Sequence, residues 1–311
     1  MSFEQLMEHA HALQQKAIEK EVKQFKDAVE SEGQGNMDRY VEDQRQRSTQ
    51  TYAGVPGIFQ PFTEMPKPET FDGMINHLAT VMRKLSKGQS EDAINGQLYP
   101  ANSTLDELSG AGAWLANWTG EAASEFKANF VDKFPSVVAN QFLLASVLKG
   151  ALEAEREIWV RARADIDKIA HDGLEALEGA GGCGRNDWKM RFTVVAAVVA
   201  LAAVPVTGGA SLLAITAVGS AASVAAEASA DPPPEMRFSG ESAYAVIQQV
   251  SEAATKLVEY INQQEQKIAV AMKSAQSVVG ASRSSFVSAR PQLAEADARN
   301  VTSGDYMGYS R

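Results

Sequence analysis

The chain has 311 residues, of which 45% are hydrophobic, and its 39 acidic and 29 basic residues give a net charge of -10. This length allows one elongated or two compact domains. The acidic balance, with no basic stripe carrying interleaved aromatic residues, argues against nucleic-acid binding, and the single cysteine excludes an intramolecular disulfide framework.

The first part of the chain predicts one amphipathic helix followed by a linker. Apolar residues recur at helical spacing over about residues 2–31, and Gly33 and Gly35 end the pattern. Residues 1–53 therefore divide into this helix and a linker. The chain opens without a basic region followed by an apolar run, so export by the general secretory route is not indicated.

Four prolines between Gly54 and Pro68 predict an extended connector over residues 54–69, because proline lacks the N–H that a helix interior needs. Phe59 and Phe62 would pin this connector to the body of the protein. After it, apolar residues at helical spacing predict a short helix that contains Met74, Leu78, Val81, Met82 and Leu85.

Residues 70–184 predict a helical hairpin that turns at Trp118. Thr104 and Glu107 have the spacing of a capping box for the helix that leads to the turn. Thr119 would cap the helix that leaves it, and the indole of Trp118 would be buried over both helix ends.

The second helix of this hairpin begins after Gly120, whose missing Cβ would let the two helices approach closely. Phe126, Phe130 and Phe134 follow at four-residue intervals. This spacing places three aromatic rings on one side of the helix.

Trp118, Gly120, Ala122 and Phe126 form the pattern Trp-x-Gly-x-Ala-x-x-x-Phe, with Phe130 one turn further along. Between two helical patterns, this motif resembles the signature of the WXG family, the helical-hairpin proteins that type VII (ESX) secretion systems export. The resemblance implies that these five residues form a turn and interaction motif. Its partner would be the secretion machinery or another helical-hairpin protein.

The resemblance covers about residues 70–178 and implies a protein that is cytoplasmic before export and secreted or at the cell surface afterwards, without an N-terminal signal peptide. The chain departs from the family in one respect. The family's export motif, a Tyr followed four residues later by Asp or Glu, does not occur after any Tyr, and Tyr40, Tyr244 and Tyr260 each have Gln at that position.

Residues 136–178 contain no proline and predict one helix on the order of 65 Å long. Residues 239–299 predict a second long helix, and residues 300–311 a flexible tail. We expect the two helices to lie antiparallel in an all-α, elongated bundle. The seam of the second helix follows heptad spacing and consists of Ala254, Leu257, Ile261, Gln264, Ile268, Ala271, Ala275 and Val278.

Residues 192–230 carry a single charged residue, Glu227. Their length admits a membrane span, but Pro205 and the glycines after it divide the stretch, so we predict an apolar Ala/Gly-rich helical hairpin over residues 185–238. Three alternatives remain open: packing in water, membrane insertion after a conformational change, and constant anchoring. The residues that would meet a membrane are Val195, Val199, Leu201, Leu212, Leu213 and Ile215.

We predict no enzymatic activity, cofactor or metal site. Residues 179–184 satisfy Gly-x-Gly-x-x-Gly but follow a helix, whereas the dinucleotide fingerprint follows a strand, so they predict a flexible joint. Cys183 has no His at nucleophile-base spacing. The histidines are predicted to be solvated, as are three glutamates interleaved with arginines; these are His9, His11, His77, His171, Glu153, Glu155 and Glu157.

Two functions are indicated by these patterns. The first is a type VII secretion substrate or a secretion-associated helical binding or structural protein. The alternative is a pore-forming or membrane-active helical toxin that resembles cytolysin A and inserts residues 192–230. Besides the secretion partners, a second copy of the chain and a membrane are candidate partners, and nucleic acid is not.

Overall fold

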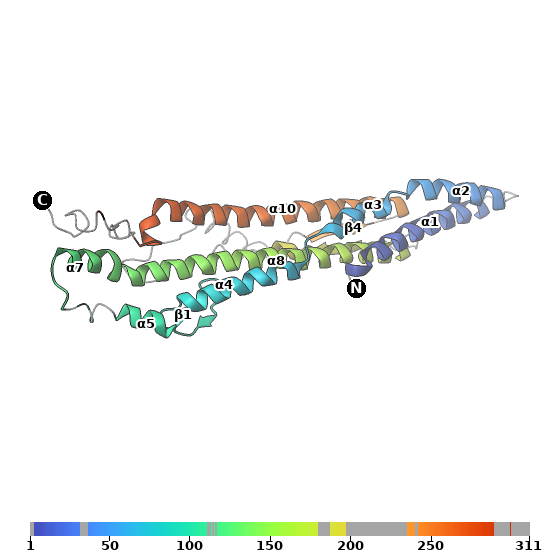
Figure 1. Ribbon diagram of the computed structural model, residues 1–311. Coiled ribbons are helices and arrows are strands. Elements are labelled where there is room, and N and C mark those ends of the chain that lie inside the picture. Colours follow the sequence, from blue (N-terminus) through green and yellow to red (C-terminus); the bar gives the residue numbers. More distant parts are fainter. Residues whose placement is uncertain are drawn as a thin grey trace. The chain divides into compact units, whose positions relative to one another are not determined.

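The computed structural model describes residues 3–31, 37–110, 113, 115, 117–179, 187–196, 235–239, 242–288 and 299. The described part is all-α with long helices, as the sequence predicts (Figure 1). Its elements are η1 (Phe3–Gln5), α1 (Leu6–Ser31), α2 (Met37–Thr51), α3 (Val55–Phe59), η2 (Gln60–Glu64), η3 (Pro68–Phe71), α4 (Asp72–Leu85), β1 (Ser90–Glu91), β2 (Leu98–Tyr99), α5 (Ser103–Ser109), α7 (Glu121–Phe126), the π-helical turn η4 (Lys127–Val131), α8 (Phe134–Gly179), β3 (Asp187–Arg191), η5 (Thr193–Ala196), β4 (Glu235–Ser239), α10 (Ala243–Ala281) and η7 (Arg283–Ser285).

The chain divides into two compact units, and the long helices α8 and α10 each contribute to both. Unit 1 contains Met1–Thr70, Glu155–Val198 and Ala228–Lys267. Unit 2 contains Phe71–Ala154, Val199–Glu227 and Ile268–Arg311.

In unit 1, α8 and α10 run antiparallel, because Gly173 of α8 lies against Val250 while Glu155, earlier in α8, lies near Glu265, later in α10. Gly173 is also one of the places where α1 contacts these helices. A Cβ there would come within 2.7 Å of Val250 Cγ2 and 3.2 Å of Leu13 Cδ1. Three helices therefore meet at one position that has no room for a side chain.

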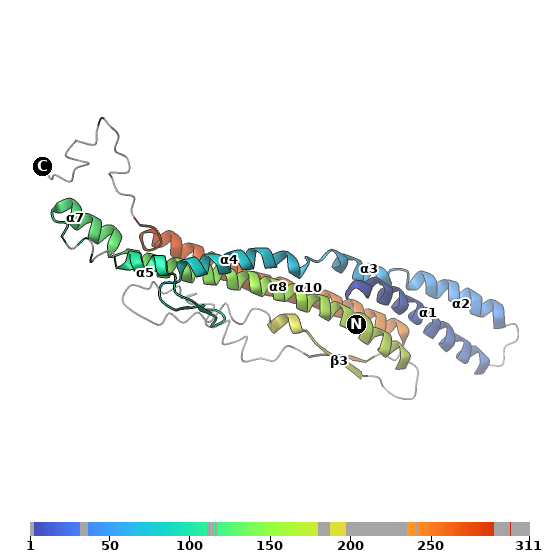
Figure 2. The same ribbon diagram turned by 60° about the horizontal axis from the view of Figure 1, so that its bottom comes forward.

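The buried face of α1 has the predicted helical spacing and consists of Leu6, Ala10, Leu13, Ala17, Ile18 and Val22. Helix α2 lies beside α1 in both views (Figures 1 and 2), although the sequence predicts a linker there. Its residues form no continuous apolar stripe, and the hairpin is completed by Ser48 and Tyr52, which are buried. Gln14 Nε2 of α1 donates to Tyr52 O at 3.1 Å, so tertiary contacts stabilise a helix that hydrophobic periodicity does not reveal.

The proline-rich connector is helical rather than extended. Pro56 and Pro61 lie in the first turns of α3 and η2, where the missing N–H has no intrahelical partner to lose. The prolines thus start short helices instead of preventing them. Phe59 and Phe62 are buried as predicted, at 0% and 5% exposure.

The predicted seam of α10 is confirmed along the helix. Of its eight members Ala271 and Val278 are partly buried and the other six are buried. Gln264 is accommodated within the seam, where its Oε1 accepts a hydrogen bond from Lys267 Nζ at 3.4 Å.

Unit 2 packs α4 and the β1–β2 hairpin against the first part of α8. Its core cluster contains Met82, Tyr99, Phe142 and Ala145, and the Tyr99 and Phe142 rings meet edge to face with centroids 5.7 Å apart. At the other side of α8, Asn140 and Gln141 donate to the backbone carbonyls of Ser285 and Phe286, which fixes η7.

Two details of unit 2 differ from the sequence prediction. Asn102 caps α5, because its Oδ1 accepts a hydrogen bond from Thr104 N at 3.2 Å, so the helix begins at Ser103 and the predicted capping box does not start it. Met74, one of the apolar residues whose spacing predicts α4, is 50% exposed, whereas Ile75, which was not among them, is buried together with Met82.

An antiparallel two-stranded ribbon in unit 1 encloses the apolar stretch, where the sequence predicts only helices. Strands β3 and β4 pair from Asp187 opposite Ser239 to Arg191 opposite Glu235. Arg191, before the apolar stretch, and Glu235, after it, are therefore neighbours across the ribbon. From Lys189 to Val194 exposed and buried residues alternate, a period of two that is too short to stand out beside the long helices.

Candidate functional site

Four aromatic rings follow one another in unit 2, from the turn before α7 through α7 and η4 to the start of α8, and we call them the aromatic row. Ring centroids lie 5.4 Å apart for Trp118 and Phe126, 5.3 Å for Phe126 and Phe130, and 6.1 Å for Phe130 and Phe134. These distances favour attraction between aromatic rings. The predicted row of phenylalanines is therefore confirmed, and Trp118 extends it by one ring.

Trp118 is 46% exposed, so the prediction of an indole buried over two helix ends is wrong. The indole packs on Phe126 instead. The outer end of the aromatic row thus presents an apolar surface to solvent.

Gly120 fixes the turn before α7 through its backbone conformation. Its φ of 104° and ψ of 171° lie in a region that essentially only glycine occupies. A Cβ there would meet nothing within 4 Å, so the predicted close approach of two helices is not the reason for the glycine. Gly120 is also the N-cap of α7, and no side chain caps this helix, which corrects the role predicted for Thr119.

The aromatic row contains a π-helical turn. Asp132 N donates to Lys127 O at 2.8 Å, a bond over five residues that widens the helix where Phe126 and Phe130 stack with ring planes 26° apart. Such turns recur at functional sites. The side chain of Ala122, the remaining residue of the predicted motif, lies outside the part of the chain that the structure describes.

A polar ladder runs along the same turns of helix. Asn129 Nδ2 donates to Glu125 Oε2 at 2.6 Å, and Lys133 Nζ donates to Asn129 Oδ1 at 3.3 Å. The ladder has an acidic end and a basic end. Together with the row it forms a helical surface of the kind that an amphipathic partner helix can cover.

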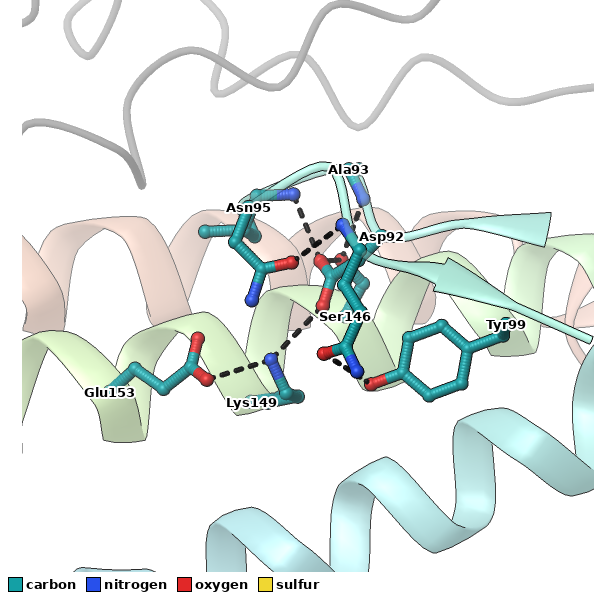
Figure 3. A network of polar contacts seen from close by, with 9 residues as sticks. Asp92, Ala93, Asn95, Tyr99, Ser146, Lys149 and Glu153 are labelled. Carbon is teal, nitrogen blue, oxygen red and sulfur yellow. Dashed lines mark hydrogen bonds and ion pairs between the residues drawn. The ribbon is translucent and has the colours of Figure 1, made fainter.

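A second polar cluster in unit 2, which the sequence analysis did not identify, holds the β1–β2 hairpin on α8 (Figure 3). Lys149 Nζ lies 3.1 Å from Asp92 Oδ2 and 2.7 Å from Glu153 Oε1. Asp92 Oδ1 accepts hydrogen bonds from Ser146 Oγ at 2.6 Å and from Ile94 N at 3.0 Å. The side chains of Asp92 and Lys149 are 0% and 4% exposed, so the ion pair is buried.

The cluster is satisfied and closely packed. Ser146 Oγ also accepts a hydrogen bond from Ala93 N, and Ile94 lies on α8 at Gly150, where a Cβ would come within 2.8 Å of the isoleucine side chain. Burial lowers the pKa of Lys149, but hydrogen bonds to Glu153 and Asp92 outweigh burial and the pKa is raised. Lys149 therefore stays charged, and we assign the cluster to structure.

In unit 1, residues 161–167 of α8 hold two other parts of the chain, and we call them the α8 anchor segment. On the side of α1, His9 Nδ1 donates to Asp167 Oδ1 at 2.8 Å, and the Arg163 guanidinium lies 4.4 Å from the centre of the Phe3 ring. His9, whose side chain is 23% exposed, is thus partly buried and bonded, in contrast to the solvated state predicted for it.

On its other side, the α8 anchor segment holds the chain that follows β3. Asp165 accepts hydrogen bonds from Thr193 Oγ1 and Val194 N, each at 3.0 Å, and Arg161 Nη1 donates to Thr193 O at 3.1 Å. Phe192, directly before, packs on Tyr260 of α10 with centroids 5.2 Å apart.

Two carboxyl groups of α8 have raised pKa values. Burial raises the pKa of Asp165 to about 6, although the bonds from Val194 and Thr193 and the nearby Arg161 act to lower it. Burial also raises the pKa of Glu155, and Glu265 adds to the rise. Glu155 is partly buried and accepts a hydrogen bond from Trp159 Nε1 at 3.1 Å, in contrast to the solvated face predicted for it.

Most of the predicted membrane-contacting residues lie outside the described part of the chain: Val199, Leu201, Leu212, Leu213 and Ile215. Val195 lies in η5, but its side chain is not described. The predicted joint at residues 180–184, including Cys183, and the tail at 300–311 also lie outside it. Within the described residues one helix, Ala123–Glu178, has the length and composition of a membrane span, and 61% of its apolar window is buried in the protein, which is typical of a core helix.

The described residues include no group of three or more His, Cys, Asp and Glu side chains that could hold a metal ion. We assign the candidate functional site to the aromatic row at the Trp118 turn, where stacked rings support a half-exposed tryptophan. Comparison of the chain with protein-family models, with curated proteins and with solved structures found no match.

Proposed function

We propose that the chain is a substrate or an accessory helical protein of a type VII (ESX-like) secretion system and is recognised through its aromatic row. The observation that carries this proposal is that Trp118 is 46% exposed. It lies in a turn that depends on a backbone conformation of Gly120 that only glycine adopts readily. A tryptophan kept half in solvent and supported by stacked rings is typical of an interaction surface rather than of a core.

The chemistry of the surface indicates the kind of partner. The aromatic row offers apolar rings along consecutive turns of a helix, and the polar ladder beside it offers a carboxylate at one end and an ammonium group at the other. An amphipathic helix of the secretion machinery or of a helical-hairpin protein would bury the rings.

The test is an export assay in a host with a type VII system. Trp118→Ala and Phe126→Ala should abolish export while the purified variants keep their helical circular dichroism spectra. Tyr244→Ala is the matched control, since Tyr244 is an aromatic residue of 55% exposure on α10, and it should be exported normally. Normal export of Trp118→Ala would contradict the proposal.

The β3–β4 ribbon supports a second candidate, a membrane-active helical protein that uses residues 192–230. Pairing of Arg191 with Glu235 brings together the two ends of a long stretch with almost no charge. Such a stretch can change its surroundings while the ribbon keeps its ends fixed. A hairpin insertion, with both ends on the same side of the membrane, is the mode that this arrangement favours.

Liposomes separate the two candidates. If the second is right, the purified chain floats with anionic vesicles and releases entrapped dye, and Val199→Asp and Leu213→Asp abolish both effects, since a charge in the bilayer centre costs at least about 2.5 kcal/mol. Val160→Asp, at an exposed position of α8, is the matched control and should remain active. A parent protein that neither floats nor releases dye refutes this candidate and leaves the first intact.

A further inference from the structure

The contact between Asp165 and the chain after β3 joins one buried carboxyl group to the start of the apolar stretch. Asp165 is 1% exposed, and its two oxygens accept the bonds from Thr193 Oγ1 and Val194 N. Met190, Phe192 and Val194 are each 0% exposed. The segment is therefore seated on the helices by alternate side chains, and Asp165 is its polar attachment.

The partners of Asp165 suit either protonation state of the carboxyl group. The Val194 N–H can only donate, and it needs one acceptor oxygen in both states. The Thr193 hydroxyl can donate to a carboxylate, or it can turn and accept the proton of a neutral carboxylic acid. Protonation thus keeps both contacts and removes the cost of burying a charge.

We propose that Asp165 is a proton-operated anchor, which holds Thr193 and Val194 on α8 more firmly as a neutral acid than as a carboxylate. The anchor tightens on acidification and loosens towards neutral pH. The proposal holds for a secretion substrate and for a membrane-active protein alike. It concerns only how firmly Thr193 and Val194, at the start of the apolar stretch, are bound to α8.

The groups around Asp165 agree with this direction. Arg161, on the same helix, is the charged group that lowers the pKa of Asp165, but its Nε is bonded to Glu157 Oε1 at 2.6 Å and its Nη1 to Thr193 O. Of the described residues, η5 contributes hydroxyl and backbone groups, α10 contributes Tyr260 against Phe192, and α1 contributes His9, which is bonded to Asp167. Burial remains the dominant effect on the pKa.

The sign and size of the effect are set by linkage. The open state of the proposal is the one in which residues 193–194 have left α8 and water reaches the carboxyl group. Asp165 has a pKa of about 6 when anchored, against 3.8 for an ordinary carboxyl group in water, so the anchored state binds the proton more tightly than the open state and gains as the pH falls through this window. The equilibrium between anchored and open states should shift about tenfold towards the anchored state between about pH 7.5 and about pH 5.

Amide hydrogen exchange of Val194 in the full chain reads this equilibrium directly, because its N–H is the anchored donor. After correction for the intrinsic exchange rate, protection should rise about tenfold between about pH 7.5 and about pH 5. Protection that does not change with pH, or that falls on acidification, would overturn the proposal.

Three variants separate the anchor from general stability. Asp165→Asn keeps an acceptor for Val194 and a donor for Thr193, so it should show the high protection of the acidic state at both pH values. Asp165→Ala should lose protection at both. Thr193→Val removes a hydrogen bond that favours the carboxylate, so the pKa of Asp165 should rise further and the gain on acidification should increase. Asp167→Asn, a buried carboxyl on the same helix that binds His9, is the control and should keep the full gain at Val194. Asp165→Asn behaving like Asp165→Ala would refute the mechanism.

Discussion

Replacing Lys149 with methionine should destabilise unit 2 more than replacing either of its two acidic partners. Lys149→Met keeps most of the side-chain volume but leaves Asp92, which is 0% exposed, and Glu153 facing the same space without a cation. Removal of one member of a buried ion pair costs about 3–5 kcal/mol, because a buried charge is left uncompensated.

The two acidic partners should differ from each other for the same reason. Asp92→Asn leaves Lys149 paired with Glu153 at 2.7 Å, so it loses one charge-assisted bond and costs about 1.5–3 kcal/mol. Glu153→Gln leaves the buried Asp92–Lys149 pair in place, and its own side chain is 27% exposed, so the cost should be about 1 kcal/mol or less. The expected order is Lys149→Met, then Asp92→Asn, then Glu153→Gln.

Urea unfolding of the full chain, followed with amide exchange of the β1–β2 hairpin, measures these costs. The decisive variant is the double substitution Asp92→Asn with Lys149→Met, which removes the uncompensated aspartate. It should be more stable than Lys149→Met alone. If the double variant is the less stable of the two, or if Glu153→Gln costs as much as Lys149→Met, the account of the cluster as a buried charge balanced by one lysine is wrong.

Four further predictions concern single positions. Gly120→Ala should cost about 1–3 kcal/mol in unfolding experiments, since alanine must adopt a glycine-only conformation; a cost near zero would show that the turn relaxes. Trp118→Ala should cost about 1–2 kcal/mol, below the roughly 3–5 kcal/mol typical of a buried tryptophan, and a larger loss by calorimetry would mean that the indole is a core residue. Gly173→Ala should lower the melting temperature because its Cβ would come within 2.7 Å of Val250, whereas Gly280→Ala, with nothing within 4 Å, should not. Because the pKa of Asp165 is raised, the stability of the parent relative to Asp165→Asn should rise by about 1.4 kcal/mol between about pH 7.5 and about pH 5, and a fall on acidification would reverse the assigned sign.

Periodicity predicts the long helices correctly because each of them buries one face over many turns. In α8 and in the α10 seam, buried positions recur over many turns, so the apolar periodicity stays visible in the sequence even where single residues depart from it. Helix α2 has no such stripe, and its stability depends on α1. The prolines of α3 and η2 are compatible with two structures, an extended segment or the first turn of a helix. Only the surrounding packing decides which of the two forms.

The sequence predicted part of the candidate site, because that part depends on regular spacing along a helix. The spacing of Phe126, Phe130 and Phe134 places their rings together whatever else the chain does. The exposure of Trp118 depends on which other parts of the chain pack on the indole, which spacing does not determine. Asp92 and Lys149 are 57 residues apart in sequence, so their pairing could not be read from a local pattern. The one signal in the sequence was that Lys149 stands among apolar residues of a helix, which indicates a lysine that needs a buried acidic partner.

The π-helical turn at Lys127–Val131 amounts to one residue more than a regular α-helix needs. Removing a single residue there would restore an unbroken α-helix and improve its backbone bonding. Because the widened turn absorbs the extra residue, the helix before it would keep nearly the same orientation around the axis, and Phe126 and Phe134, then seven residues apart, would stay on one side. Phe130 would lie three residues instead of four from one of its neighbours, so the even four-residue spacing of the rings would be lost. In a regular α-helix, rings four residues apart turn by about 40° per step around the axis, and the widened turn holds the aromatic row closer to one line.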